Sequence, residues 1–75
     1  MDTKKIGEFL KILRREKGLT QEQLAEILHV SGRTVSRWET GTNMPDLSIL
    51  IQMAEFYTVD VKEILDGERE GREYE

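Results

Sequence analysis

Apolar side chains near the start of the chain recur at the spacing of one helical face. They fall at i, i+4 and i+7, the pattern of a half-buried helix: Ile6, Leu10 and Leu13. We expect a first helix from about Thr3 to Lys17, with Thr3 as its N-cap. Gly18 follows, where helices commonly end in a left-handed residue.

A second, shorter apolar stripe predicts a second helix. It consists of Leu24, Ala25 and Leu28. Thr20 precedes it, and its hydroxyl can accept a hydrogen bond from the amide of Gln23. The Gln23 side chain can reach back to the Thr20 amide, which completes a capping box. The second helix therefore begins at Thr20.

A third helix is expected from Ser31, its N-cap, to about Thr40. Val35 and Trp38 form its inner face, and Gly41 ends it.

Two further helices are expected in the second half of the chain. Pro45 disfavours helix at the residue before it, so residues 42–45 form a loop and Asp46 caps a fourth helix. The apolar residues of this helix are Leu47, Leu50, Met53 and Ala54. Asp60 caps a short fifth helix, which Gly67 ends; its apolar residues are Val61, Ile64 and Leu65. With no β-branched alternating run, the predicted fold class is all-α.

The 75 residues suffice for one domain, which we expect at residues 1–67. Residues 68–75 are charged and nearly free of apolar side chains, so we expect a flexible C-terminal tail. The chain has no Cys, no signal-peptide pattern and no apolar run of membrane-spanning length. We expect a cytoplasmic protein that does not associate with membranes.

The net charge of −4 is unevenly distributed. Residues 1–41 carry eight Lys and Arg against six Asp and Glu, whereas residues 42–75 carry three against nine. Charges act over about 8–10 Å in physiological salt, so the local sign decides what each half attracts. The basic first half is compatible with nucleic acid, and the acidic second half weakens nonspecific binding.

The candidate binding face lies on the third helix. Arg33 and Arg37 are one turn apart on the same face, which Ser36 and Thr40 share. An arginine fork can donate two hydrogen bonds to guanine O6 and N7 in the major groove of DNA. Small residues at Ser31, Gly32 and Ser36 let the helix approach a groove closely. The start of the second helix, with Thr20 and Gln21, can hold a phosphate.

The segment LTQEQLAEILHVSGRTVSRWETG resembles the lambda-repressor-like (Cro/CI, XRE-type) helix-turn-helix family. The matching residues are Thr20-Gln21, Leu24-Ala25, Val30-Ser31, Val35-Ser36, Trp38-Glu39 and Gly41, with Pro45-Asp46-Leu47, Val59 and Ile64-Leu65 beyond them. The resemblance covers about residues 5–67. It implies a compact five-helix domain in which the second and third helices form the helix-turn-helix. It also implies that the third helix enters the major groove of a double-stranded operator and that homodimers read two half-sites.

The resemblance also implies roles for individual residues. Base-reading positions fall at Arg33, Arg37, Ser36 and Gly32. Backbone contacts fall at Thr20, Gln21, Ser31, Thr34 and, in the following loop, Asn43. Arg14 and Glu39 are expected to form an ion pair that positions the recognition helix.

Several residues depart from the family pattern. His29 and Thr58 stand where a turn commonly has Gly, at positions that favour positive φ. Gly32 leaves only backbone at a position that often reads bases. The loop from Thr42 to Met44 contains no Lys or Arg, so we expect a shallow salt dependence of DNA binding.

Alternatives remain open for some of these residues. Arg33 and Arg37 could be solvated surface charges, and Arg14 and Glu39 could be independent of each other. Trp38 could stack on a base, although its period places it in the core. His29 is a turn residue or a pH sensor. Either Phe9 and Ile12 widen the core stripe or they belong to a contact surface, and the same question holds for Ile49, Ile51 and Tyr57.

No catalytic constellation is present. The chain has a single His, no Cys and no Gly-rich phosphate loop, so we expect no enzyme activity, cofactor or metal site. The leading hypothesis is a sequence-specific DNA-binding transcriptional regulator, a repressor without a separate sensing domain. The alternative is an antitoxin or protein-interaction module on the same fold, with a small protein partner.

Overall fold

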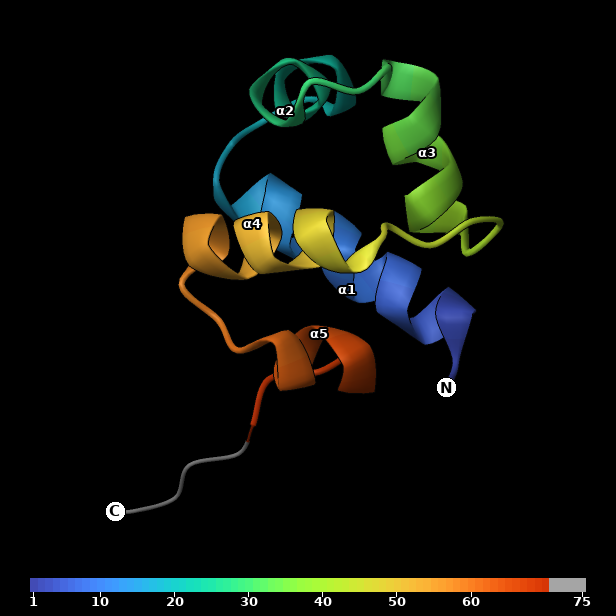
Figure 1. Ribbon diagram of the computed structural model, residues 1–75, viewed down its shortest axis with the longest axis vertical. Coiled ribbons are helices and arrows are strands. Elements are labelled where there is room, and N and C mark those ends of the chain that lie inside the picture. Colours follow the sequence, from blue (N-terminus) through green and yellow to red (C-terminus); the bar gives the residue numbers. More distant parts are fainter. Residues whose placement is uncertain (71–75) are drawn as a thin grey trace.

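In a computed structural model, residues 1–70 of the chain are described, and their regular structure is five α-helices (Figure 1). The expected all-α fold class is confirmed. The helices are α1 (Thr3–Glu16), α2 (Gln21–Leu28), α3 (Gly32–Thr40), α4 (Leu47–Tyr57) and α5 (Val61–Asp66).

The long α1 is the centre of the arrangement. It packs against α3 and α5, while α3 also packs against α2 and α4 packs against α5. In Figure 1, α4 crosses in front of α1, with α2 and α3 above the crossing and α5 below it. The helix-turn-helix of α2 and α3 therefore stands on one side of α1, and α5 lies on the other (Figure 1).

The starts of α2, α3 and α4 follow the predicted capping chemistry, and the start of α1 corrects it. The Thr20 hydroxyl accepts from the Gln23 amide at 3.1 Å, and Gln23 Oε1 accepts from the Thr20 amide at 2.9 Å. The N-cap of α1 is Asp2, not Thr3, because the Asp2 carboxylate accepts from the amide of Lys5 at 3.1 Å. A carboxylate at this position also interacts favourably with the helix dipole.

Left-handed residues end four of the helices. Gly41 and Gly67 follow α3 and α5 with φ of 81° and 72°, as predicted. His29 and Thr58 follow α2 and α4 with φ of 60° and 58°. The two turns thus adopt the left-handed conformation without glycine, and each side chain bears a modest strain, larger for the β-branched Thr58.

The core lies where the faces of the helices meet. Its buried apolar residues are Ile6, Phe9, Leu10, Leu13, Leu24, Ala25, Leu28, Val35, Trp38, Leu50, Met53, Ala54, Tyr57 and Ile64. Trp38 is only 4% exposed, which rules out base stacking in this conformation. Phe9 and Tyr57 are core residues, whereas Ile12, Ile51 and Leu65 are exposed.

Gly7, which lies within α1, allows α1 and α3 to approach closely. A Cβ atom at Gly7 would lie 2.5 Å from the Trp38 carbonyl oxygen and 2.6 Å from that of Glu39. Both atoms belong to the backbone of α3, so neither can rotate away. The sequence pattern did not single out this residue. A glycine inside a helix costs about 1 kcal/mol relative to alanine. A glycine within a predicted helix therefore indicates a packing or functional reason for its presence.

We expect Gly7→Ala to lower the free energy of unfolding by about 1–3 kcal/mol, although alanine favours helix, because the added methyl group forces α1 and α3 apart. Urea denaturation followed by circular dichroism measures the change. Glu8→Ala is the control for adding an alanine to α1 without a clash, since Glu8 is adjacent to Gly7 and exposed. An unchanged or increased stability of Gly7→Ala would contradict the close approach.

Residues 68–70 contact the helical body. Lys5 Nζ and Glu68 Oε1 are 3.1 Å apart, and Arg69 pairs with Glu16 of α1. The expected flexible tail began at residue 68; its last five residues, 71–75, lie outside the described part of the chain. Within residues 1–70, no helix is long and apolar enough to cross a membrane.

Candidate nucleic-acid interface

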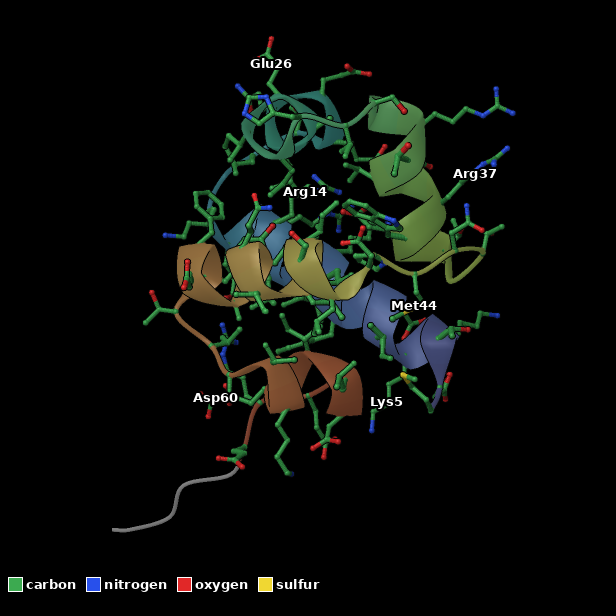
Figure 2. The ribbon with its side chains drawn as sticks, viewed as in Figure 1. Lys5, Arg14, Glu26, Arg37, Met44 and Asp60 are labelled. Carbon is green, nitrogen blue, oxygen red and sulfur yellow. The ribbon has the colours of Figure 1, made fainter. Side chains whose placement is uncertain are left out.

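The outer face of α3 presents two arginines to solvent. Val35 and Trp38 anchor the inner face in the core, so Arg33 and Arg37 are exposed on the other side. Neither guanidinium forms an ion pair or hydrogen bond with any residue between 1 and 70. Figure 2 shows Arg37 projecting from α3 away from the other helices. The two arginines among the predicted base-reading residues therefore both lie on the exposed face of α3.

The turn into α3 is closed by its own polar groups. Ser31 Oγ accepts from the Thr34 amide at 3.1 Å and lies 2.9 Å from Thr34 Oγ1. Gly32, the first residue of α3, lies beneath the carboxylate of Glu22, which occupies the space that a Cβ at Gly32 would need. A ligand that approaches the Gly32 backbone must therefore displace the flexible end of Glu22.

Arg14 and Glu39 form the expected ion pair between α1 and α3. Arg14 Nε donates to Glu39 Oε2 at 2.6 Å, and the second arm donates to Oε1 at 3.0 Å. The side chains are 9% and 4% exposed. The hydrogen bonds to Glu39 raise the pKa of Arg14, against the opposing effect of burial. The third arginine nitrogen donates to the carbonyl oxygen of Leu19 at 2.8 Å, which fixes the link between α1 and α2.

Gln21 extends this network to the first residue of α2. Its Nε2 donates to Glu39 Oε1 at 3.0 Å, so one carboxylate oxygen receives both the arginine and the glutamine. Figure 2 shows Arg14 pointing into the space enclosed by α1, α2 and α3. The network therefore ties all three helices together and fixes the direction of the Gln21 amide.

The loop after α3 is tied back to the recognition helix. The backbone amides of Thr42 and Asn43 both donate to the carbonyl oxygen of Arg37, at 2.9 and 3.3 Å. The hydroxyls of Thr40 and Thr42 lie 2.9 Å apart. The Asn43 side chain is exposed at this end of α3.

Tyr57 of α4 lies beside the Arg14–Glu39 pair, and the sequence pattern left its role open. Its ring is buried, and its hydroxyl has no hydrogen-bond partner within the described chain. Burial, reinforced by the negative charge of Glu39, raises the pKa of Tyr57 from 10.0 to about 12. The hydroxyl is thus held neutral next to a charged network.

We expect Tyr57→Phe to retain or exceed the parent's stability at pH 7, because the lost hydroxyl has no partner to leave unsatisfied. Between pH 10 and 12 the folded parent keeps a proton that the unfolded chain has lost. Its free energy of unfolding should therefore fall by about 1.4 kcal/mol per pH unit more than that of the variant. Urea denaturation at pH 8 to 11.5 measures this difference. Parallel curves for the two proteins would show that the Tyr57 pKa is not raised.

The arrangement of the five helices agrees with that of known proteins. The sequence profile of a helix-turn-helix family matches residues 10–64, which include the whole of α2, α3 and α4. The chain belongs to this family. Its five helices have the lambda-repressor-like fold, and the family binds double-stranded DNA.

Relatives within the family include proteins with opposite regulatory roles. The HTH-type transcriptional activator BcrR of Enterococcus faecalis is 45% identical over 62 residues, covering 83% of this chain and 30% of that protein. The competence pilus inhibition repressor of Acinetobacter baylyi is 34% identical over 59 residues, covering 79% and 54%. This helix-turn-helix chain therefore spans about a third to a half of the length of these relatives.

Solved structures extend the likeness to three dimensions. The restriction-modification controller protein C.AhdI from Aeromonas hydrophila has a TM-score of 0.74 and 30% sequence identity. The match covers 84% of this chain and 96% of that one. The likeness thus extends over most of the chain and is not confined to the helix-turn-helix.

Proposed function

We propose that this helix-turn-helix chain is a transcriptional regulator that binds a specific double-stranded DNA site by placing α3 in the major groove. The observation that carries the proposal is the pair of exposed, unpaired arginines on the outer face of a helix that is rigidly anchored from behind. Surface arginines that only solubilise a protein need no such support. In this proposal Arg33, Arg37 and Ser36 contact base edges, with the Gly32 backbone beside them.

The DNA backbone is contacted from both ends of this unit. Thr20, Gln21, Ser31 and Thr34 lie at the starts of α2 and α3, where free amides and the helix dipoles attract phosphate. Asn43 lies at the opposite end, after α3. The Gln21 amide has two hydrogens, and Glu39 holds one of them, so the second can point at a phosphate without further ordering of the side chain. The Arg14–Glu39 pair thus positions a backbone contact as well as the recognition helix.

Selection from random duplex DNA tests the proposal most directly. We expect enrichment of a site that contains guanines about two base steps apart in each half, matching the two forks on successive turns of α3. Failure to enrich any sequence, together with binding that depends only on salt, would overturn sequence-specific recognition.

The proposed direction of regulation is repression. The relatives include an activator and a repressor, so the family alone leaves the direction open. Repression by occupancy requires only that the protein cover a promoter, which a domain of this size can do. A reporter placed behind the selected site should lose expression when the protein is produced, and a gain of expression would reverse the assignment.

We propose that the regulator acts as a homodimer joined through α4 and α5. Leu47 and Ile51 are one turn apart on α4 and are 65% and 45% exposed, and Leu65 of α5 is 37% exposed. Equilibrium sedimentation should give a dimer for the parent and a monomer for Ile51→Glu. If sedimentation finds only one chain of 8.7 kDa, both without DNA and bound to a DNA duplex, the dimer is refuted. A mixed complex with a second protein would favour the antitoxin-like alternative.

A further inference from the structure

Two adjacent lysines at the start of α1 have different surroundings. The backbone of Lys4 lies against Gly41 at the end of α3, since a Cβ at Gly41 would be 2.9 Å from Lys4 Cα and 3.0 Å from its nitrogen. Lys5 instead lies against Gly67 at the end of α5. Figure 1 shows this end of α1 next to the loop that follows α3.

The charges of the two lysines are also used differently. Lys5 Nζ is 3.1 Å from Glu68 Oε1, and Figure 2 shows Lys5 directed toward the α5 side of the molecule. Lys4 is exposed and forms no ion pair with any residue from 1 to 70. Four other cations of α1 and α3 are likewise exposed and form no ion pair within residues 1–70: Lys11, Arg15, Arg33 and Arg37.

The loop that begins beside Lys4 lacks a cation of its own. Thr42, Asn43 and Met44 follow Gly41 directly, and the Thr42 and Asn43 amides are bound to the carbonyl oxygen of Arg37. When a recognition helix lies in the major groove, its end and the following loop approach the sugar-phosphate backbone. A lysine that contacts this end from α1 can supply the missing charge, because a compact ammonium on a flexible stem binds phosphate as a point charge.

We infer that Lys4 is a DNA-backbone contact that anchors the Gly41 end of α3 to a phosphate. The inference rests on the proposed placement of α3 in the major groove and adds a residue from outside the helix-turn-helix to the interface. It also changes an expectation drawn from the neutral loop: the salt dependence of binding includes a phosphate contact contributed by α1.

The neighbouring lysines provide a matched experiment. Lys4→Gln and Lys5→Gln remove the same charge from adjacent residues, and each is compared with the parent for binding to the selected duplex between 50 and 200 mM salt. We expect Lys4→Gln to reduce the slope of log affinity against log salt by about 1, so that its affinity falls about three- to fourfold less than the parent's over this range. At low salt it should bind specific and unrelated duplexes more weakly by a similar factor. Lys5→Gln should retain the parent's slope, and unchanged circular dichroism and melting temperature confirm that both variants are folded.

Arg37→Ala separates this inference from the proposed function. If Arg37→Ala loses affinity for the selected site while Lys4→Gln and Lys5→Gln both keep the parent's slope, the Lys4 contact is refuted and the placement of α3 stands. If the parent binds no duplex, or Arg37→Ala binds as the parent does, the placement of α3 fails and the Lys4 contact fails with it.

Discussion

Glu39→Ala is expected to destabilise the domain by about 3–5 kcal/mol, the largest effect of any single substitution considered for this chain. The variant leaves the buried Arg14 guanidinium without its carboxylate and removes the acceptor of the Gln21 amide. Domains of this size have a total stability of only about 4–11 kcal/mol. The melting temperature should therefore fall by more than about 12 °C, which thermal circular dichroism measures.

Two comparisons determine whether the loss comes from an unpaired buried charge. Glu16→Ala removes an acid from the exposed Glu16–Arg69 pair and should leave the melting temperature nearly unchanged, because solvent screens this pair. Replacing Arg14 by Met and Glu39 by Leu together removes both charges and should recover most of the stability. If the double variant is as unstable as Glu39→Ala, the cost lies in lost packing or hydrogen bonding rather than in the stranded arginine.

The double variant also separates stability from positioning. It keeps apolar contacts between α1 and α3 but offers Gln21 no acceptor, so the amide loses its fixed direction. We therefore expect a folded protein that binds DNA more weakly than the parent, with base preference unchanged. This combination distinguishes a network that orients a phosphate contact from one that only stabilises the fold.

The features that were predictable from the sequence are those encoded within a few residues. The capping box at Thr20, the cap at Ser31 and the glycine after α3 each depend on local hydrogen bonds or backbone conformation, so sequence spacing identifies them. Trp38 was assigned to the core by its period alone. The Arg14–Glu39 pair joins residues 25 apart in sequence, and only the family resemblance indicated it.

The features that were missed depend on how separate helices meet. Nothing local distinguishes Lys4 from Lys5, yet one lies at the end of α3 and the other at the end of α5. A side chain at Gly7 would collide with the backbone of α3, and the carboxylate of Glu22 covers Gly32. Asp2 and Thr3 are adjacent residues that can both cap a helix, so spacing does not separate them, and the Asp2 carboxylate is the group that accepts from the Lys5 amide.

Arg33→Ala and Arg37→Ala are each expected to weaken binding to the selected site by about 1–3 kcal/mol, or roughly 5- to 150-fold. Each should also relax base preference at one position, since a fork that contacts guanine O6 and N7 carries sequence information. Because the two side chains lie one turn apart, each is expected to contact a different base. The double variant should therefore lose most of its specificity and keep only backbone affinity. Fluorescence anisotropy on the selected duplex and on single-base variants measures both effects.

Substitutions that preserve charge provide the deciding control. Arg37→Lys keeps the positive charge but cannot form the planar fork, so it should lose base preference nearly as much as Arg37→Ala while retaining the salt slope. Lys62→Ala removes an exposed cation of α5 that pairs with Asp66, far from α3 in sequence, and should bind as the parent does. If Arg37→Lys binds and discriminates like the parent, the arginine acts only through its charge. Base reading must then come from Ser36, the Gly32 backbone or the shape of the DNA.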